Sequence, residues 1–321
     1  MKISILTPAH NAESTLEQCV KMVSAMDFAG EIEQIIIDDG STDGTPQLAD
    51  QLALQYPFVT VIKKVAGGEA SALNAGLKIT GGDYIAILEA DVEPARNWLS
   101  ELLPLFSDSK VMGVGGYLKT PPGDSWIARI AGYEIEEKMR YKPANTVHIT
   151  SANALYRREA FEIAGDFREE LVNASLDADF NYRLVDKGFK LIFYPRASVF
   201  HHYKVSLGEF LARQFAYARY RVYLKAGELY PADKWVGVEA GLAGLLCLSC
   251  CVIPWGWYWP LPILFLMLLI PGVSAVGLYA RYRDKVLLAY PLVFTLRAFV
   301  HLAGICLGGI AKVLGWDRAK K

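Results

Sequence analysis

Cysteine is scarce in this chain of 321 residues, and its five copies do not follow a metal-site or disulfide spacing. Cys19 and Cys306 stand alone. Cys247, Cys250 and Cys251 lie inside a long apolar stretch, where they resemble small apolar residues. We therefore expect neither a zinc site nor disulfide bonds.

The chain also lacks an excess of charge of either sign, because its formal net charge is only −1. There is no bulk electrostatic argument for a nucleic-acid partner, and we expect none. The apolar run near the N-terminus, from Ile3 to Leu6, is too short for a secretory signal peptide. We therefore expect the N-terminal part to remain in the cytoplasm.

Charge is missing altogether from residues 241–280. Two membrane spans need roughly 20 apolar residues each, and Pro254 to Pro260, with three Trp between them, break the run near its middle. Pro and Gly favour a turn there, and Trp and Tyr suit a headgroup interface. We predict a helical hairpin at about 238–254 and 261–280. The alternative, a buried helix pair in a large soluble core, fits an uncharged run of this length poorly.

Basic residues flank the predicted hairpin on both sides, with Lys234 before it and Arg281 and Arg283 after it. The positive-inside tendency places both flanks in the cytoplasm. A third apolar segment, 286–314, is interrupted by Arg297 and His301. If it crossed the membrane, the basic C-terminal tail would lie outside, so we expect it to lie in the membrane or dip into it. Together these features predict a multi-pass cell-membrane protein.

Residues 207–235 mix aromatic and basic side chains, a composition typical of a helix on an anionic membrane surface. A helix packed under the preceding domain with solvated arginines is equally compatible. The chain thus divides into a domain at 1–206, an amphipathic region at 207–235 and a membrane region at 236–321.

Short apolar strands alternate with helices in the first third of the chain. This pattern predicts an α/β fold, a mostly parallel, Rossmann-like sheet with helices on both faces. The expected strands are 2–9, 34–39, 59–64 and 84–88, and the expected helices are 13–26, 45–56 and 69–79. Ligands bind at the carboxyl ends of the strands in such sheets.

Polar residues follow three of these strands: Thr7, then Asp38 and Asp39, then Glu89 and Asp91. The carboxylates of the segment Asp38 to Asp43 could accept hydrogen bonds from a base or a ribose, although Asp-Gly-Ser is also a good turn. Acidic residues just beyond a buried strand commonly hold Mg²⁺ or Mn²⁺ on phosphates. Glu89 and Asp91 could equally be a strand-end helix cap before Pro94.

Taken together, the motifs resemble glycosyltransferase family 2 of the GT-A fold, in the family's order over roughly residues 1–225. The matching segments are Thr7-Pro8-Ala9-His10-Asn11, Asp38 to Asp43, Gly68 with Ala72 to Gly76, Gly81 to Ile85, Glu89-Ala90-Asp91, Thr150 to Ala154, Arg157-Arg158, Ala164 to Phe167, and Asp177 to Phe180 with Arg183-Leu184.

The resemblance implies a role for each matching residue. Asp177 would be the general base, and Asp91 with His201 would bind a divalent metal, Mn²⁺ or Mg²⁺. The nucleotide-sugar donor would contact Thr7, Pro8, Ala9, Asn11, Asp38, Asp39, Gly68, Asn74, Glu89 and Ala90. The acceptor side would include Thr150, Ser151 and Asn153, together with Arg213 and Arg219 of the aromatic-basic segment.

Three positions depart from the family's usual pattern: Glu89 replaces an Asp, Leu176 replaces the Glu before the base, and Glu69 replaces a basic residue. A Gln-x-x-Arg-Trp motif, typical of processive synthases, is absent. We expect a membrane-anchored, inverting enzyme that transfers one sugar to a lipid-linked or polyprenyl phosphate acceptor. A catalytically inactive sugar-nucleotide or glycan-binding protein is the main alternative, and a transporter subunit is a weaker one.

Overall fold

The computed structural model describes residues 1–169, 176–203, 206–222, 233–251 and 260–315. The chain forms two compact units. The first contains Met1–Asp124 and Gly132–Tyr203, and the second contains Ser125–Ala131 and Lys204–Lys321. We describe each unit by itself.

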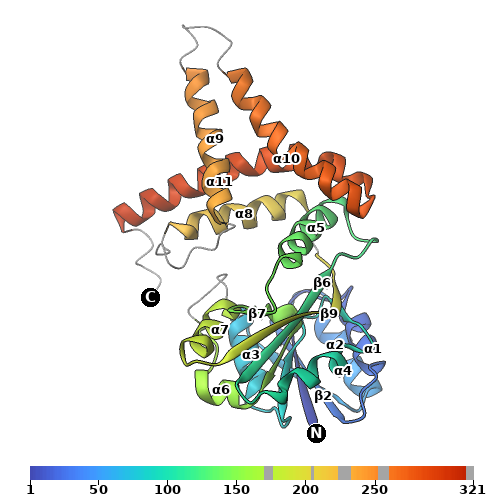
Figure 1. Ribbon diagram of the computed structural model, residues 1–321. Coiled ribbons are helices and arrows are strands. Elements are labelled where there is room, and N and C mark those ends of the chain that lie inside the picture. Colours follow the sequence, from blue (N-terminus) through green and yellow to red (C-terminus); the bar gives the residue numbers. More distant parts are fainter. Residues whose placement is uncertain (170–175, 204–205, 223–232, 252–259, 316–321) are drawn as a thin grey trace. The chain divides into compact units, whose positions relative to one another are not determined.

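The first unit is built on one sheet, whose strands follow the order β3-β2-β1-β4-β8-β6-β9-β5, with β7 also paired to β9. Within the described residues the strands are β1 (Lys2–Ala9), β2 (Glu31–Asp39), β3 (Val59–Lys64), β4 (Tyr84–Ile87), β5 (Val92–Pro94), β6 (Val111–Lys119), β7 (Asn145–Thr146), β8 (Ala154–Arg157) and β9 (Lys190–His201). Helices cover both faces (Figure 1).

Strands β1 to β4 pair in parallel, as the strand–helix alternation predicts. Ala9 lies opposite Asp38, so the loops after β1 and β2 begin at the same edge of the sheet. Strand β2 starts at Glu31, three residues earlier than expected, because Lys2 on β1 pairs with Glu31 (2.9 Å) and Glu33 (2.7 Å). Charged cross-strand pairs of this kind extend a strand without any apolar signal.

The other half of the sheet is mixed. Strand β8 is antiparallel to both β4 and β6, and β9 is parallel to β6 but antiparallel to β5 and β7. Strand β6 contains Gly113, Gly115 and Gly116, and a Cβ at Gly116 would lie 1.7 Å from the Ala197 carbonyl oxygen. Glycine is required for this close approach.

Two groups of helices bury opposite faces of the sheet. Leu16 of α1 (Leu16–Ser24) and Leu52 of α2 (Thr45–Gln55) pack with Ile36. Leu73 of α3 (Glu69–Leu77) and Phe180 of α7 (Leu176–Asp186) pack on the face of Ile35 and Ile37. The remaining helices are α4 (Trp98–Leu102), α5 (Trp126–Arg140), α6 (Glu159–Ala164) and the 3-10 helices η1 (Leu103–Ser107) and η2 (Ser151–Asn153).

Helix α1 starts at Leu16, three residues later than the sequence pattern predicts. Asn11 has a φ of 51°, and its main chain enters a turn rather than a helix. Asn tolerates this left-handed conformation better than most residues. The loop after β1 therefore extends to Thr15 before the helix begins.

The second unit contains α8 (Leu207–Arg221), α9 (Asp233–Cys251), α10 (Pro260–Tyr282), the 3-10 helix η5 (Lys285–Ala289) and α11 (Tyr290–Leu314). The predicted turn at 254–260 lies largely outside the described residues. Pro260–Tyr282 and Lys285–Leu314 are long and apolar enough to cross a membrane, and Val236–Cys250 is a shorter apolar helix.

Helix α8 packs along α11 rather than standing alone. A Cβ at Gly304 would lie 2.7 Å from the Phe215 carbonyl oxygen, and one at Gly308 would lie 2.4 Å from that of Arg219. Small residues four apart allow this close approach between helices. Phe210 and Ala218 of α8 are buried, whereas Arg213 is exposed. One face of α8 is therefore packed, against α11 of its own unit, while its packing under the preceding domain stays a prediction.

The two polar residues inside the third apolar segment have partners on other helices. The Arg297 guanidinium forms an ion pair with Glu239 of α9 and lies 3.6 Å from the centre of the Phe294 ring. His301 lies 3.0 Å from Glu239 and 3.2 Å from Gln214 of α8. Buried ionisable groups in membrane regions are commonly paired in this way.

Candidate active site

Three potential metal ligands meet at the edge of the sheet. One side-chain ligand atom from each of Glu89, Asp91 and His201 lies within 4.8 Å of the others. The Nε2 atom of His201 is 3.4 Å from Asp91 Oδ1 and 3.7 Å from Glu89 Oε2. Two carboxylates and an imidazole are a suitable donor set for Mn²⁺ and other divalent ions.

Strand pairing accounts for this meeting of residues distant in sequence. Glu89 and Asp91 follow β4, and β5 begins at Val92, which lies opposite His201 of β9. Burial alone would lower the pKa of His201, but the charges of Asp91 and Glu89 outweigh it and raise that pKa. Burial raises the pKa of Glu89, and Asp91 adds to this effect, while His201 opposes it. Without a metal ion, a proton on His201 offsets the charge of the two carboxylates, and a divalent ion could replace that proton.

The neighbouring His202 has a different role from His201. Its Nδ1 lies 2.8 Å from Asp124, and its Nε2 lies 2.8 Å from Glu93. With both ring nitrogens occupied by carboxylates, His202 ties the end of β9 to β5 and to the segment after β6.

Asp177 lies in the first turn of α7 and is mostly buried. Its Oδ1 accepts a hydrogen bond from the Ala178 amide (2.8 Å), and its Oδ2 lies 3.1 Å from His148 Nε2. Burial would raise the pKa of Asp177, but the bond and charge of His148 and the amides of Ala178 and Ser151 hold it below its usual range. The carboxylate is therefore ionised at neutral pH.

Ser151 connects Asp177 to the metal-ligand group. Its hydroxyl donates a hydrogen bond to Glu89 Oε1 (2.9 Å), and its amide contributes to holding Asp177 ionised. The residue belongs to η2, between the loop of His148 and strand β8. Ser151 thus places the potential base close to the potential metal ligands.

Glu69, at the start of α3, adds a further carboxylate. Burial, together with the charges of Glu89 and Asp177, raises its pKa to about 8. Lys142 has the opposite charge to Asp177. Burial lowers the pKa of Lys142 to about 8, and Asp177 opposes that shift. We refer to Glu69, Glu89, Asp91 and Asp177 as the carboxylate cluster. Leu176 stands where the family usually has a Glu before the base, and Glu69 and Glu89 are the acidic side chains that interact with Asp177.

The loops on the predicted donor side are fixed by Asp39. It accepts hydrogen bonds from Lys64 Nζ (2.6 Å), the Gly67 amide (2.9 Å) and the Gly68 amide (2.7 Å). Burial would raise the pKa of Asp39, but these donors lower it overall. Both carboxylate oxygens of Asp39 accept hydrogen bonds from this chain. The Asp39 side chain therefore holds the glycine turn before α3. Gly68 has a φ of 87° and open space where a side chain would be.

The loops after β1 and β2 are joined to each other. The Asn11 side chain accepts a hydrogen bond from the Thr42 amide (2.9 Å), and the Asn11 amide donates to Ser41 Oγ (2.9 Å). Asp38 accepts from the Ser41 amide (3.1 Å). Thr7, Ala9 and Ala90 are buried, and Thr7 accepts from Gln34 (3.0 Å). Pro8 and Asn11 retain exposed surface.

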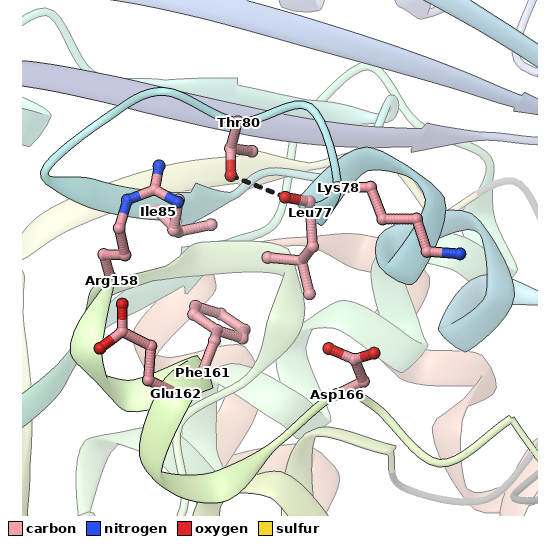
Figure 2. A pocket seen from close by; sticks show the side chains of 8 residues that line it. All are labelled: Leu77, Lys78, Thr80, Ile85, Arg158, Phe161, Glu162 and Asp166. Carbon is pink, nitrogen blue, oxygen red and sulfur yellow. Dashed lines mark hydrogen bonds between the residues drawn. The ribbon is translucent and has the colours of Figure 1, made fainter.

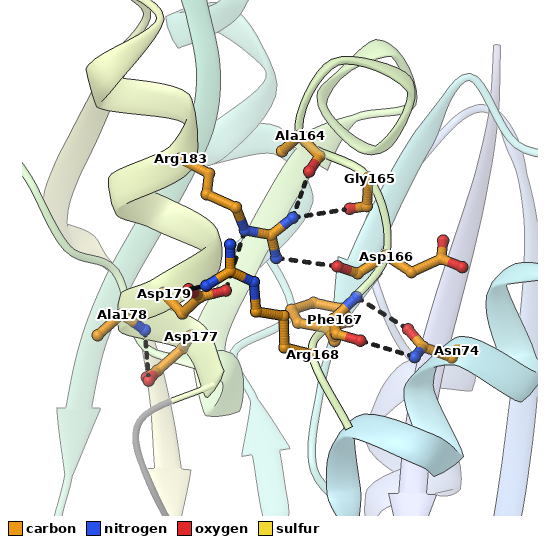
Figure 3. Close-up of polar contacts among 10 residues, drawn as sticks. All are labelled: Asn74, Ala164, Gly165, Asp166, Phe167, Arg168, Asp177, Ala178, Asp179 and Arg183. Carbon is orange, nitrogen blue, oxygen red and sulfur yellow. Dashed lines mark hydrogen bonds and ion pairs between the residues drawn. The ribbon is translucent and has the colours of Figure 1, made fainter. Parts of the chain in front are cut away.

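Asn74, predicted on the donor side, is hydrogen-bonded to the segment that follows α6 (Figure 3). Its Nδ2 donates to the Phe167 carbonyl (2.8 Å) and to Glu169 (2.9 Å), and its Oδ1 accepts from the Phe167 amide (3.0 Å). Arg183 donates to the carbonyls of Ala164 and Asp166 and pairs with Asp179 at 2.9 Å. Asp179 also pairs with Arg168 at 3.0 Å, a structural role distinct from that of Asp177.

Asn153, predicted on the acceptor side, is fully buried. It accepts from Trp98 Nε1 (2.7 Å) and donates to the carbonyls of Tyr117 and Ala197 (both 3.2 Å). Thr150 is partly exposed, and Ser151 is buried against Glu89. Arg213 and Arg219 belong to α8 in the second unit.

A pocket of about 230 Å³ lies away from these residues (Figure 2). Its lining comes from the end of α3 and the turn after it, from strand β4, and from helix α6 and the residues that flank it: Leu77, Lys78, Thr80, Ile85, Arg158, Phe161, Glu162 and Asp166. The lining includes no member of the carboxylate cluster. Both signs of charge occur around it, so no ligand class is selected.

Sequence reasoning missed three residues near Asp177: Glu69 as a member of the cluster, Lys142 and His148. None of them forms a motif. The one usable signal was the position of Glu69 directly after the turn at Gly67 and Gly68, at the start of a helix.

The sequence of residues 4–163 matches the model of "Glycosyl transferase family 2". The chain is 29% identical over 203 residues to a beta-monoglucosyldiacylglycerol synthase of a Nostoc species, covering 60% of this chain and 43% of that protein. It is 25% identical over 216 residues to glycosyltransferase AglE of Haloferax volcanii, covering 66% of this chain and 70% of that protein. The chain thus spans less than half the length of the synthase.

Two solved structures share the fold. A mannosyltransferase of Pyrobaculum calidifontis, PcManGT, in complex with GDP-Man and Mn²⁺, superposes with a TM-score of 0.61 at 18% identity, covering 98% of this chain and 87% of that one. GalNAc-T7 with UDP, GalNAc and Mn²⁺ gives a TM-score of 0.53 at 19% identity, covering 68% and 50%. The chain belongs to glycosyltransferase family 2, and its first unit has the GT-A fold.

Proposed function

We propose that the protein is a metal-dependent, inverting glycosyltransferase that moves one sugar from a nucleotide-sugar donor to an acceptor held at the membrane. The observation that carries this proposal is the meeting of Glu89, Asp91 and His201 within 4.8 Å, beside an ionised Asp177. A ligand group and a general base at one edge of the sheet are the parts that such a transfer needs.

The donor set fits a divalent cation of the Mg²⁺ or Mn²⁺ class. The carboxylates of Glu89 and Asp91 and the Nε2 of His201 point to a common region, and burial, with the neighbouring carboxylate charges, raises the pKa of Glu89 and Glu69. When bound, such an ion offsets negative charge on the departing diphosphate. The two solved neighbours named with Mn²⁺ support this choice of ion.

The chain's own residues supply binding and proton transfer. The backbone at Gly68 and the exposed edge of Pro8 and Asn11 would receive the nucleotide, with Asp39 fixing the turn below it. Asp177 would take the proton of an acceptor hydroxyl as the acceptor attacks the sugar carbon from the face opposite the leaving group. A single displacement of this kind inverts the configuration at that carbon.

A membrane-associated acceptor is supported by two features. Helices α10 and α11 have the length and composition of membrane spans. A relative named for monoglucosyldiacylglycerol synthesis acts, by its name, on a lipid. Both a lipid-linked hydroxyl and a polyprenyl phosphate remain candidates. A phosphate acceptor is already ionised at neutral pH and would need little help from Asp177.

The test is release of nucleoside diphosphate from UDP-, GDP- and dTDP-sugars by the purified full chain, with Mn²⁺ or Mg²⁺ and membrane lipid extract. We expect turnover with one donor. Asp177→Asn should reduce transfer to a hydroxyl by a factor on the order of 10² or more and spare donor binding. Asp91→Asn should weaken metal-dependent donor binding, and the exposed Glu17→Gln should change neither.

Two outcomes would contradict this assignment. Metal-dependent binding of a nucleotide sugar without any turnover would identify a binding protein, the alternative suggested by Leu176 and Glu89. Wild-type transfer to a hydroxyl by Asp177→Asn would remove the base. Transfer by that variant to a phosphate alone would instead define the acceptor class.

A further inference from the structure

His202 forms two short side-chain contacts directly beside the three potential metal ligands. Its Nδ1 lies 2.8 Å from Asp124 Oδ1, and its Nε2 lies 2.8 Å from Glu93 Oε1. Ionised carboxylates only accept hydrogen bonds, so both ring nitrogens of His202 donate. The ring is therefore fixed from two sides, by strand β5 and by the segment after β6.

The same histidine is linked through the main chain to two of the ligands. His201 precedes it in the chain, and Asp91 lies two residues before Glu93. The His202 amide also donates a hydrogen bond to the Asp91 carbonyl (2.9 Å). A shift of His202 would thus move His201 through the peptide bond, and it would move Asp91 through this main-chain contact and through Glu93.

Strand β5, which follows Asp91, is a weak support by itself. It has three residues and lies at the end of the strand order, and its Pro94 has no amide proton to donate. A strand of this length offers few main-chain hydrogen bonds to hold the 3.4 Å spacing between Asp91 Oδ1 and His201 Nε2. The contact between Glu93 and His202 adds a side-chain tie between β5 and the end of β9.

We propose that His202 is a positioning residue that holds Asp91 and His201 at the spacing a divalent cation requires. This inference rests on the proposed function and deepens it, because it concerns the same metal site. His202 acts through the two ligands and does not touch the ion, since its ring nitrogens are engaged with Glu93 and Asp124. Groups that orient metal ligands in this way contribute strongly to metal affinity.

Charge alone predicts the opposite effect of removing this side chain. A histidine that donates from both ring nitrogens carries a positive charge. Its loss would leave the carboxylates of Glu93 and Asp124 uncompensated near the site, where they would attract a cation more strongly. A weaker metal affinity without His202 therefore reports on the position of the ligands and not on the charge around them.

The experiment measures the Mn²⁺ concentration that half-saturates the retention of radiolabelled UDP or GDP by the purified full chain in detergent. In His202→Gln we expect this concentration to rise by roughly 10- to 100-fold. Glu33→Gln is the matched control, because Glu33 forms a cross-strand ion pair with Lys2 (2.7 Å) at the start of β1 and β2. It should leave the Mn²⁺ requirement unchanged, and melting temperatures in chelator compare the stability of the two variants.

A charge-matched pair of variants at Glu93 tests the same contact from its other side. Glu93→Gln and Glu93→Ala remove the same negative charge, but only glutamine keeps an oxygen that can accept from His202. We expect the larger rise in the Mn²⁺ requirement in Glu93→Ala. This comparison holds even where His202→Gln does not fold.

A Mn²⁺ requirement that is unchanged or lower in His202→Gln overturns the positioning role, and so do equal effects of the two Glu93 variants. A rise that Glu33→Gln shares also overturns it, because the effect then follows general destabilisation. Retention of nucleotide by the wild type without any need for Mn²⁺ overturns the metal site of the proposed function. Retention of neither nucleotide overturns the proposed function as a whole, and the positioning role with it.

Discussion

The pKa of Glu69 depends on the charges of the surrounding site. It stands where the family usually has a basic residue, and burial with the charges of Glu89 and Asp177 raises its pKa from 4.5 to about 8. The folded protein therefore holds a proton that the unfolded chain releases between these two values. Stability should fall as the pH rises through this window in the absence of metal, because unfolding then releases a proton that the folded state holds.

Replacing this residue tests the sign of the effect. In a chelator, Glu69→Gln should have the melting temperature of the wild type near pH 5 and a higher one at pH 8, with the difference growing between. Thermal unfolding of the purified protein in detergent at several pH values measures it. Glu17→Gln, on the exposed face of α1, should show no such trend. Parallel pH profiles for Glu69→Gln and wild type would mean that Glu69 is ionised throughout.

Sequence reasoning reached the residues with a local motif and missed those placed by long-range packing. Asp91 follows a buried strand, and that position made it a candidate ligand with an equally compatible structural alternative. His148 and Glu69 come near Asp177 only because the segment after β7 and the start of α3 converge on the start of α7. The same limit applies to Asn74 and Asn153, whose side-chain amides are hydrogen-bonded to main-chain groups far away in sequence.

At the scale of elements, the first half of the sheet was predictable because each strand is a continuous apolar run. Strands β5, β7 and β8 have four residues or fewer, too short for a periodic pattern. Strand β6 contains three glycines that read as a loop, although Gly116 is needed where the chain passes within contact of Ala197. Antiparallel pairing of β8 with β4 and β6 could not be anticipated from strand–helix alternation.

The pairing of α8 with α11 offers a matched test. A Cβ at Gly308 would lie 2.4 Å from the Arg219 carbonyl oxygen, whereas one at Gly309 would meet nothing within 4 Å. Gly→Ala favours a helix by about 1 kcal/mol at either position. Gly309→Ala should therefore stabilise the protein, while Gly308→Ala should destabilise it by about 1–3 kcal/mol through overpacking.

Thermal unfolding in detergent measures both variants. A rise in melting temperature for Gly309→Ala with a fall for Gly308→Ala would support close packing of α11 on α8. Equal rises for the two variants would show that the helices do not approach each other at Gly308.

For the whole molecule, the arrangement within the second unit bears on how it meets the membrane. Helix α8 runs beside α11 in the same direction, with Gln214 near His301 and the Val222 carbonyl bonded to Lys312 at 2.5 Å. Figure 1 shows this pair lying across α9, whereas α9 and the first part of α10 run together. Because α8 exposes Glu209 and Arg213, the α8–α11 pair fits the membrane interface better than its interior.

We predict two crossings, by α9 and α10, although α11 is also long and apolar enough to cross. A full crossing by α11 would draw the charged face of α8 into the lipid, at a cost of several kcal/mol for each unpaired charge. In a cysteine-free background, Trp257→Cys should react with a membrane-impermeant maleimide on intact cells. Ala319→Cys should react only after permeabilisation, as should Glu17→Cys, the control on the first unit. Labelling of both 257 and 319 from outside would instead require α11 to cross, with Arg297 and His301 held in the membrane by Glu239 and Gln214.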